Sequence, residues 1–148
     1  MKTIVTIIIV CLSTLSTFGQ QSLSLKIING SDKPNSETEH IYLLEVTNNS
    51  KSAVNFNISA DDKSCSDTNL SQIEMKQEVL NSQKSKNIEL TSIQPGRSFE
   101  FYIKISRPAN AKLSTWNCTE VKAVSDKGNI ISNSIIIQSL IPDPNNFN

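Results

Sequence analysis

The stretch SFEFYIKIS, residues 98–106, alternates apolar and polar side chains without a break, and it limits the fold more than any other feature of the chain. Successive side chains of an extended strand point to opposite faces of a sheet. One face therefore carries four large apolar side chains: Phe99, Phe101, Ile103 and Ile105. Full burial of each contributes about 1.5–3 kcal/mol, so we expect this strand at the centre of the core.

The residues on either side of this strand define its ends. In Gln94-Pro95-Gly96-Arg97, proline sets φ at the first central position of a turn, and glycine tolerates a positive φ at the second. This pattern predicts a type II turn directly before the strand. Pro108 ends the strand, because proline cannot donate a ladder hydrogen bond.

Six further segments share the alternation and are separated by residues typical of turns. The seven predicted strands are residues 23–30, 40–48, 53–59, 87–93, 98–106, 116–126 and 130–140. Short strands with regular turn signals and no long helix predict an all-β fold, an antiparallel β-sandwich of about seven strands. If Lys104 and Lys122 lie on edge strands, they would discourage unplanned sheet pairing.

The segment 60–86 is predicted as a loop that carries one short element. Ser71 to Glu74 fits a helix capping box, and the helix formers that follow favour a short helix. The same letters also place Ile73, Met75 and Val79 in a pattern that suits an edge strand. Both alternatives stay open.

The two ends of the chain are predicted to lie outside the folded domain. Residues 1–19 have the character of a secretory signal peptide, with Lys2, an apolar run to Leu15, and small residues up to Gly19. We expect cleavage after Gly19 or Gln20, a β-sandwich domain over 20–141, and a disordered tail at 142–148. The apolar run is too short for a permanent span, so we expect a secreted or periplasmic protein with no permanent membrane span after cleavage.

Two of the three cysteines, Cys65 and Cys118, lie outside the leader. Export would place them in an oxidising compartment, and an even number of cysteines favours a disulfide. Such a bridge would stabilise the fold by about 4 kcal/mol in the chain-entropy estimate. The alternative of two separate thiols stays open, since the flanking residues say nothing about geometry.

The stretches VTNNSKSAVNFNIS (46–59) and IQPGRSFEFYIKISRPANAKLSTWNCTEVKAVSD (93–126) resemble bacterial immunoglobulin-like or fibronectin-III-like domains, of the secreted type often appended to glycosidases. The resemblance covers residues 23–140 and depends mostly on turn residues: Asn48 to Ser50, Pro95 to Ser98, Pro108 with Ala111, and the strand end Val121 to Asp126. It implies an immunoglobulin-like sandwich and a secreted context, and it implies no catalytic residue and no cofactor. The chain departs from the pattern in lacking a glycine after Ala111, in the longer 60–86 segment and in its cysteines.

Composition and motifs exclude several classes of function. The 14 basic and 14 acidic side chains balance, so no net field attracts nucleic acid. His40 is the only histidine, and at a strand start we expect it to be a solvated end residue, not a catalytic base. Asp61, Asp62 and Asp67 offer hard oxygen ligands in one loop, but not in the order of a calcium-binding loop. They are weak calcium candidates beside the alternative of a solvated loop.

Two aromatic residues are candidates for a binding surface. Tyr102 and Trp116 point away from the core if the alternation holds, where they would stack on sugars, form a partner patch or simply cover a rim. Asparagines also occupy five Asn-x-Ser/Thr sequons, at Asn29, Asn48, Asn57, Asn69 and Asn117. They are potential glycan sites in a eukaryotic protein and chance occurrences in an Asn-rich bacterial one.

The preferred interpretation is a non-catalytic, exported immunoglobulin-like module of the bacterial cell envelope. It would bind an unknown protein or glycan of the envelope, or serve as a structural or adhesion domain. The alternative is a small secreted enzyme, or an enzyme inhibitor, whose site no local motif reveals. The first predicts a shallow surface, and the second a cleft where titratable groups converge.

Overall fold

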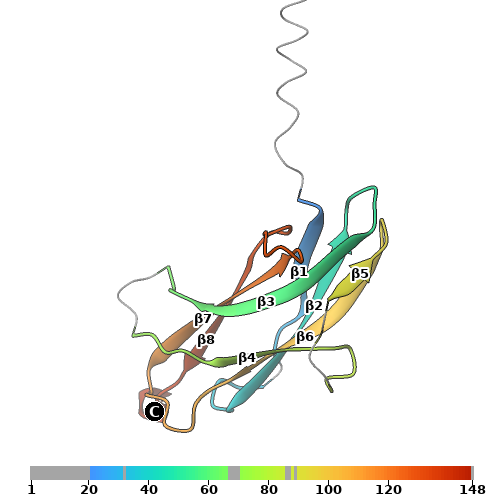
Figure 1. Cartoon of the computed structure of the whole chain (residues 1–148). Helices are drawn as coiled ribbons and strands as arrows, with labels where there is room; N and C mark the ends of the chain where they lie inside the picture. Colours follow the sequence, from blue (N-terminus) through green and yellow to red (C-terminus); the bar gives the residue numbers. More distant parts are fainter. Residues whose placement is uncertain (1–20, 32, 67–70, 86–87, 89, 148) are drawn as a thin grey trace, which may run out of the picture.

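The computed structural model describes residues 21–31, 33–66, 71–85, 88 and 90–147, and the predicted signal peptide lies outside this part of the chain. Eight strands form two four-stranded antiparallel sheets that face each other (Figure 1). The strands are β1 (Leu23–Asn29), β2 (Glu39–Asn48), β3 (Val54–Lys63), β4 (Lys76–Leu80), β5 (Thr91–Ile93), β6 (Ser98–Ser106), β7 (Thr115–Val124) and β8 (Ile135–Ile141). The all-β sandwich predicted from the alternation is confirmed.

The strand order is β1-β2-β6-β4 in one sheet and β5-β3-β7-β8 in the other. With β5 set aside, this is the constant-type immunoglobulin arrangement, in which strands A, B, E and D oppose C, F and G. β1 also bonds the segment between β7 and β8, since the Leu23 amide donates to the Ile131 carbonyl at 3.0 Å. Within the described residues, no helix has the length and apolar character needed to cross a bilayer.

The core lies between the sheets and contains the strand on which the sequence argument began. Phe101, Ile103 and Ile105 of β6 are fully buried, whereas Phe99 is half-buried and packs edge-on against Phe56 of β3 with ring centroids 6.3 Å apart. The turn before β6 has the predicted geometry. Gly96 has a φ of 67°, and the Arg97 amide donates to the Gln94 carbonyl at 3.1 Å.

In the segment 60–86 the helix prediction is wrong for the described residues, and the edge-strand alternative is right. β4 pairs with β6, with Val79 opposite the buried Ile103, so these residues extend the first sheet. The residues of the predicted capping box bind β7 instead: the Trp116 amide donates to the Ser71 carbonyl at 2.8 Å, and the Ile73 amide donates to the Trp116 carbonyl at 2.9 Å. A strand is favoured over a helix because it pairs with a β6 edge that would otherwise lack a partner.

Two smaller expectations also differ from the structure. Lys104 and Lys122 lie on β6 and β7, which are inner strands, so neither protects an edge. Beyond β8, Pro144–Phe147 form a 3-10 helix, and the Asp143 carboxylate accepts from the Asn145 amide at 3.0 Å. The last strand begins at Ile135 and not at residue 130, because the preceding residues bind β1 and β7.

Candidate functional site

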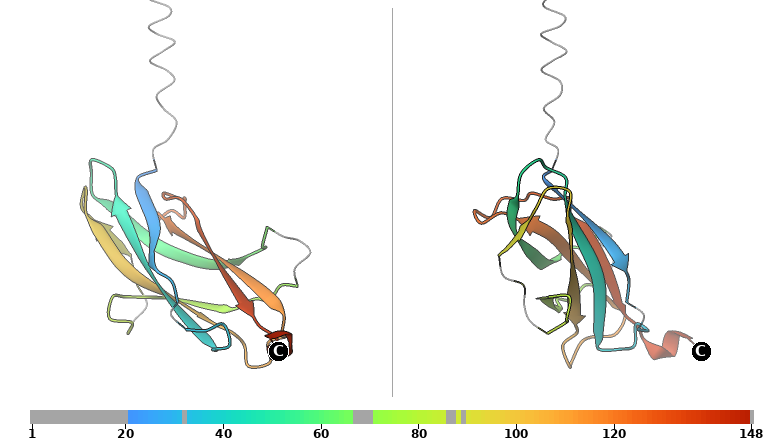
Figure 2. Two further views of the ribbon diagram at one scale, coloured as in Figure 1. Left: turned by 180° about the vertical axis from the view of Figure 1, so that it is seen from behind. Right: turned by 90° about the vertical axis from the view of Figure 1, so that its right-hand side faces the viewer.

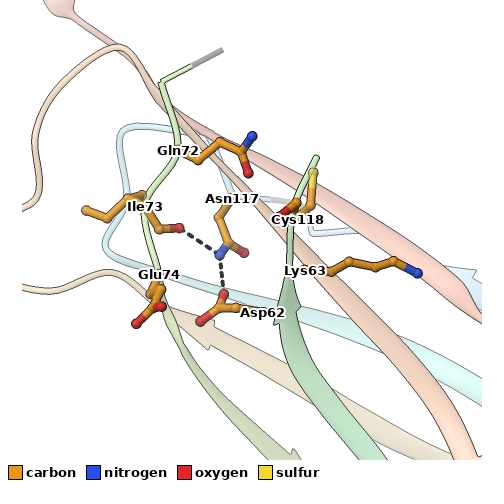
Figure 3. Close-up of a pocket in the computed structure, with 8 residues that line it drawn as sticks. Asp62, Lys63, Gln72, Ile73, Glu74, Asn117 and Cys118 are labelled. Atoms are coloured by element: carbon orange, nitrogen blue, oxygen red, sulfur yellow. Dashed lines mark hydrogen bonds between the residues drawn. The ribbon is translucent and has the colours of Figure 1, made fainter. Parts of the chain in front are cut away.

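One surface pocket lies where the chain leaves β3 and crosses toward β4. It has a volume of about 320 Å³ and lies between the end of β3, the segment 72–74 and β7. Figure 3 shows Asn117 in its middle, between Asp62 and the main chain of Ile73. The Asn117 amide donates to the Asp62 carboxylate and, at 3.0 Å, to the Ile73 carbonyl.

One oxygen of the Asp62 carboxylate, Oδ1, accepts three hydrogen bonds from the protein itself. Besides Asn117, it accepts from the Gln77 side-chain amide at 2.7 Å and from the Met75 main-chain amide at 3.3 Å. Thr119 supports the arrangement by donating to the Asn117 side-chain carbonyl at 2.9 Å. These bonds attach the segment 73–77 to β3 and β7, so the pocket is best explained by a structural role.

The three calcium candidates are not brought together by the described residues. Asp61 and Asp62 are neighbours on one strand, so their side chains point to opposite faces, and Asp61 accepts from the Ser59 hydroxyl. Asp67 lies outside the described residues. Nowhere in the described part of the chain do three potential metal-ligating residues gather.

The disulfide alternative is confirmed. Cys65, just past the end of β3, is bonded to Cys118 of β7, with Cα atoms 5.3 Å apart, and both residues are buried. The Cys65 amide also donates to the Gln72 side chain at 2.9 Å. The bridge therefore joins the chain just past β3 to β7 at Cys118, one of the residues that line the pocket.

Charged side chains of both sheets form ion pairs with residues of the same strand or of a neighbouring strand. On the second sheet, Glu120 contacts Lys63 at 2.5 Å and Lys122 at 3.0 Å, and these bonds lower the pKa of the Glu120 carboxyl to about 2. On the first sheet, Lys104 contacts Glu39 at 2.6 Å and Glu78 at 3.6 Å. The pKa of Lys104 is raised mainly by its hydrogen bond to Glu39.

The expectation that His40 is solvated is wrong. The side chain is 7% exposed and lines a small cavity together with Glu37 and Thr38, and its Nδ1 lies 3.0 Å from the Ser31 hydroxyl. Burial lowers the pKa of the imidazole, which favours its neutral form. His40 and Met75 line a cavity of about 10 Å³ together with Ser139, whose hydroxyl is the one buried side-chain polar atom of the described residues without a hydrogen-bond partner.

A wider hollow lies on the outer face of the first sheet, and we call it the Tyr102 hollow. Its volume is about 560 Å³. Leu43 is directly opposite Tyr102 in the β2–β6 register, and Leu80 of β4 flanks Tyr102 on the other side. The residues that line it are Asn29, Gly30, Lys33, Ile41, Leu43, Lys84 and Tyr102. Tyr102 thus points outward as predicted, and Ile41 and Leu43 give the hollow an apolar floor.

Two lysines lie at the rim of the Tyr102 hollow. The Lys84 ammonium lies 4.6 Å from the centre of the Tyr102 ring, a cation–π contact. Lys84 has a φ of 57°, a left-handed conformation that costs a non-glycine residue about 1–2 kcal/mol. Asn81 holds this turn, because its carbonyl oxygens accept from the Lys84 amide at 2.9 Å and the Gln83 amide at 3.1 Å. Neither Lys84 nor Lys33 makes a salt bridge with another described residue.

The second aromatic candidate is on the other sheet. Trp116 is half-buried on β7 opposite Leu140 of β8, and its main chain binds the crossover segment. The structure therefore does not bring Tyr102 and Trp116 together in one surface.

Two of the sequon asparagines have roles that the sequence analysis missed. Asn48 is fully buried and donates to the carbonyls of Ser52 at 2.8 Å and Ile93 at 2.9 Å, while its oxygen accepts from the Ser50 amide. Asn117 is 1% exposed. Both side-chain amides bind main-chain carbonyls of other segments, and their burial leaves no room for a glycan in the folded protein. Asn69 lies outside the described residues.

Comparison with known proteins gives a fold relationship only. No family model matches the chain, and no curated protein matches it. Among solved structures, the chain is similar to a FixG-related protein from Vibrio parahaemolyticus, with a TM-score of 0.53 and 11% identity over 84% of this chain and 99% of the other. A family 123 glycoside hydrolase from Clostridium perfringens matches with a TM-score of 0.45 and 16% identity, over 71% of this chain and 21% of the hydrolase.

Proposed function

We propose that this chain is an exported, non-catalytic immunoglobulin-like module that binds a protein of the cell envelope through the Tyr102 hollow. The observation that carries the proposal is that the polar side chains at the other candidate positions are hydrogen-bonded within the fold, whereas the lysines of this hollow are not paired with an acid. Asp62 Oδ1, Asn117 and His40 make hydrogen bonds within the fold, whereas the hollow combines an apolar floor with two lysines that have no acidic partner among the described residues.

The chemistry of the hollow indicates the kind of partner. Ile41, Leu43 and Tyr102 offer apolar area for a hydrophobic side chain, and Lys33 and Lys84 at the rim suit an acidic group beside it. An extended segment with an apolar residue next to an aspartate or glutamate satisfies both. The left-handed conformation of Lys84 supports a functional role, since residues in costly conformations gather at binding sites.

Export is supported by the Cys65–Cys118 disulfide, because such bridges persist in oxidising compartments. It is also supported by the character of residues 1–19, which is that of a signal peptide. The bacterial immunoglobulin-like resemblance is part of this proposal, and the strand order supports it.

The test is a binding titration with solubilised envelope proteins and, separately, with envelope glycans. We expect a protein ligand that binds about ten- to thirty-fold more weakly to Tyr102→Ala and to Lys84→Glu than to the wild type. Its affinity for the wild type should fall as the salt concentration rises. Trp116→Ala, on the other sheet, is the matched control and should bind normally. Binding that survives Tyr102→Ala, binding only to glycans, or hydrolysis of any envelope component would contradict the proposal.

A further inference from the structure

Strand β8, residues 135–141, is an edge strand with an unusual sequence. It lies at the end of the second sheet, with β7 on one side only. Its sequence, IIIQSLI, contains no charge, no proline and no glycine. Strands of this composition pair readily with a further strand when their edge is open.

The other three edges of the sandwich carry features that discourage such pairing. β1 has Lys26, an irregularity between Ile27 and Asn29, and a side-chain cover from Asn133, which bonds the Leu25 amide at 2.8 Å. β4 carries Lys76 and Glu78 and is covered by the Ile88 amide, which donates to the Val79 carbonyl at 3.2 Å. β5 has only three residues. Among the four edges, β8 alone has none of these protections.

The main chain of β8 is open along most of its length. In an antiparallel pair only alternate residues bond to a given neighbour, so the remaining amides and carbonyls of β8 point away from β7. β1 approaches the chain just before β8, at Leu23 and Ser132, and the two strands then diverge (Figure 2). The described residues supply no main-chain hydrogen bond to the far side of Ile135–Leu140.

We propose that β8 pairs antiparallel with β8 of a second copy of this chain, with the two-fold axis at Gln138. The sequence is self-complementary in this register. Ile136, which is 43% exposed, would lie opposite the second copy's Leu140, and the Gln138 amides would face each other and hydrogen-bond. The pair would join the two second sheets into one eight-stranded sheet.

A second copy fits this edge better than an unrelated strand. The apolar pattern of β8 is nearly the same in both directions about Gln138, which is what an isologous contact requires. On the outer face, Trp116 lies opposite Leu140, so the dimer would extend this apolar row to the second copy's Ile136. One seven-residue strand makes a small interface, and we expect a dissociation constant in the micromolar range.

Sedimentation velocity on the chain expressed from Met1, at concentrations from micromolar to millimolar, tests the proposal. We expect a monomer–dimer equilibrium. Gln138→Lys and Gln138→Glu should each weaken it at least ten-fold, because like charges would meet at the axis. Mixing the two variants in equal amounts should restore the dimer at low salt, since opposite charges then meet there.

Gln83→Lys is the control, because it makes the same chemical change at an exposed residue outside β8 and should leave the dimer unchanged. Circular dichroism confirms that each variant is folded. A wild-type chain that stays monomeric at millimolar concentration overturns the proposal. So does a dimer that tolerates Gln138→Lys, or a mixture of the two charged variants that remains monomeric.

Discussion

Reduction of the Cys65–Cys118 bridge should cost this protein a large share of its stability. The cysteines are separated by 53 residues, and closing a loop of that length removes about 14 cal/mol/K of chain entropy from the unfolded state, which is about 4 kcal/mol at 25 °C. The folded state should survive reduction, because Trp116 still binds Ser71 and Ile73 through main-chain hydrogen bonds. Reduction is therefore expected to lower the free energy of unfolding mainly by raising the entropy of the unfolded state.

Urea unfolding of the oxidised and reduced wild-type protein measures this effect. With an m-value of about 2 kcal/mol/M, a loss of 4 kcal/mol moves the midpoint down by about 2 M. The double variant Cys65→Ala/Cys118→Ala should behave like the reduced protein, with a small further loss for the missing buried sulfur atoms. A shift below about 0.5 M would refute the reasoning, because it would mean that the bridge does not constrain the unfolded chain.

Three further outcomes follow from the buried polar groups. Asn48→Ala should cost about 2–3 kcal/mol in urea unfolding, since the buried Ile93 carbonyl and the part-buried Ser52 carbonyl lose their donor, whereas the exposed Asn49→Ala should stay within 0.5 kcal/mol. Because the pKa of His40 is lower in the folded protein than in the unfolded chain, the unfolded chain takes up a proton at a higher pH, and the free energy of unfolding should fall as pH drops below 6.5. An equal fall in His40→Gln would show that another group causes this pH dependence. Ser139→Ala should be neutral or stabilising by about 1 kcal/mol, because its buried hydroxyl has no partner among the described residues, and a raised Tm in calorimetry would show the gain.

The strands that the sequence predicted well are those with one buried face. β6 and β3 show this, because Phe101, Ile103 and Phe56 occur at every second position and are fully buried. β4 was ambiguous because its apolar residues suit a helix face and a strand face equally. Only the open edge of β6 decides between them, and that edge is a feature of the tertiary structure.

The candidate site was predicted only in part. Alternation placed Tyr102 on the outer face, but its neighbours Lys84 and Leu43 are brought there by a turn and by a partner strand far apart in the sequence. His40 was assigned to solvent because its position in the strand does not show that Glu37 and Thr38 lie beside it at a buried site. Asn48 and Asn117 were interpreted only as parts of sequons, since the sequence does not show that their side chains are buried and hydrogen-bonded.

Photo-crosslinking in living cells tests the central claim most directly. A benzoyl-phenylalanine introduced at Tyr102, at Trp116 or at neither position would report what each face of the exported protein touches. We expect one defined protein adduct from position 102, lost when Lys84→Glu is added, and no such adduct from position 116. Equal adducts from both positions, or none from position 102, would contradict the claim that the Tyr102 hollow is the working surface of this sandwich.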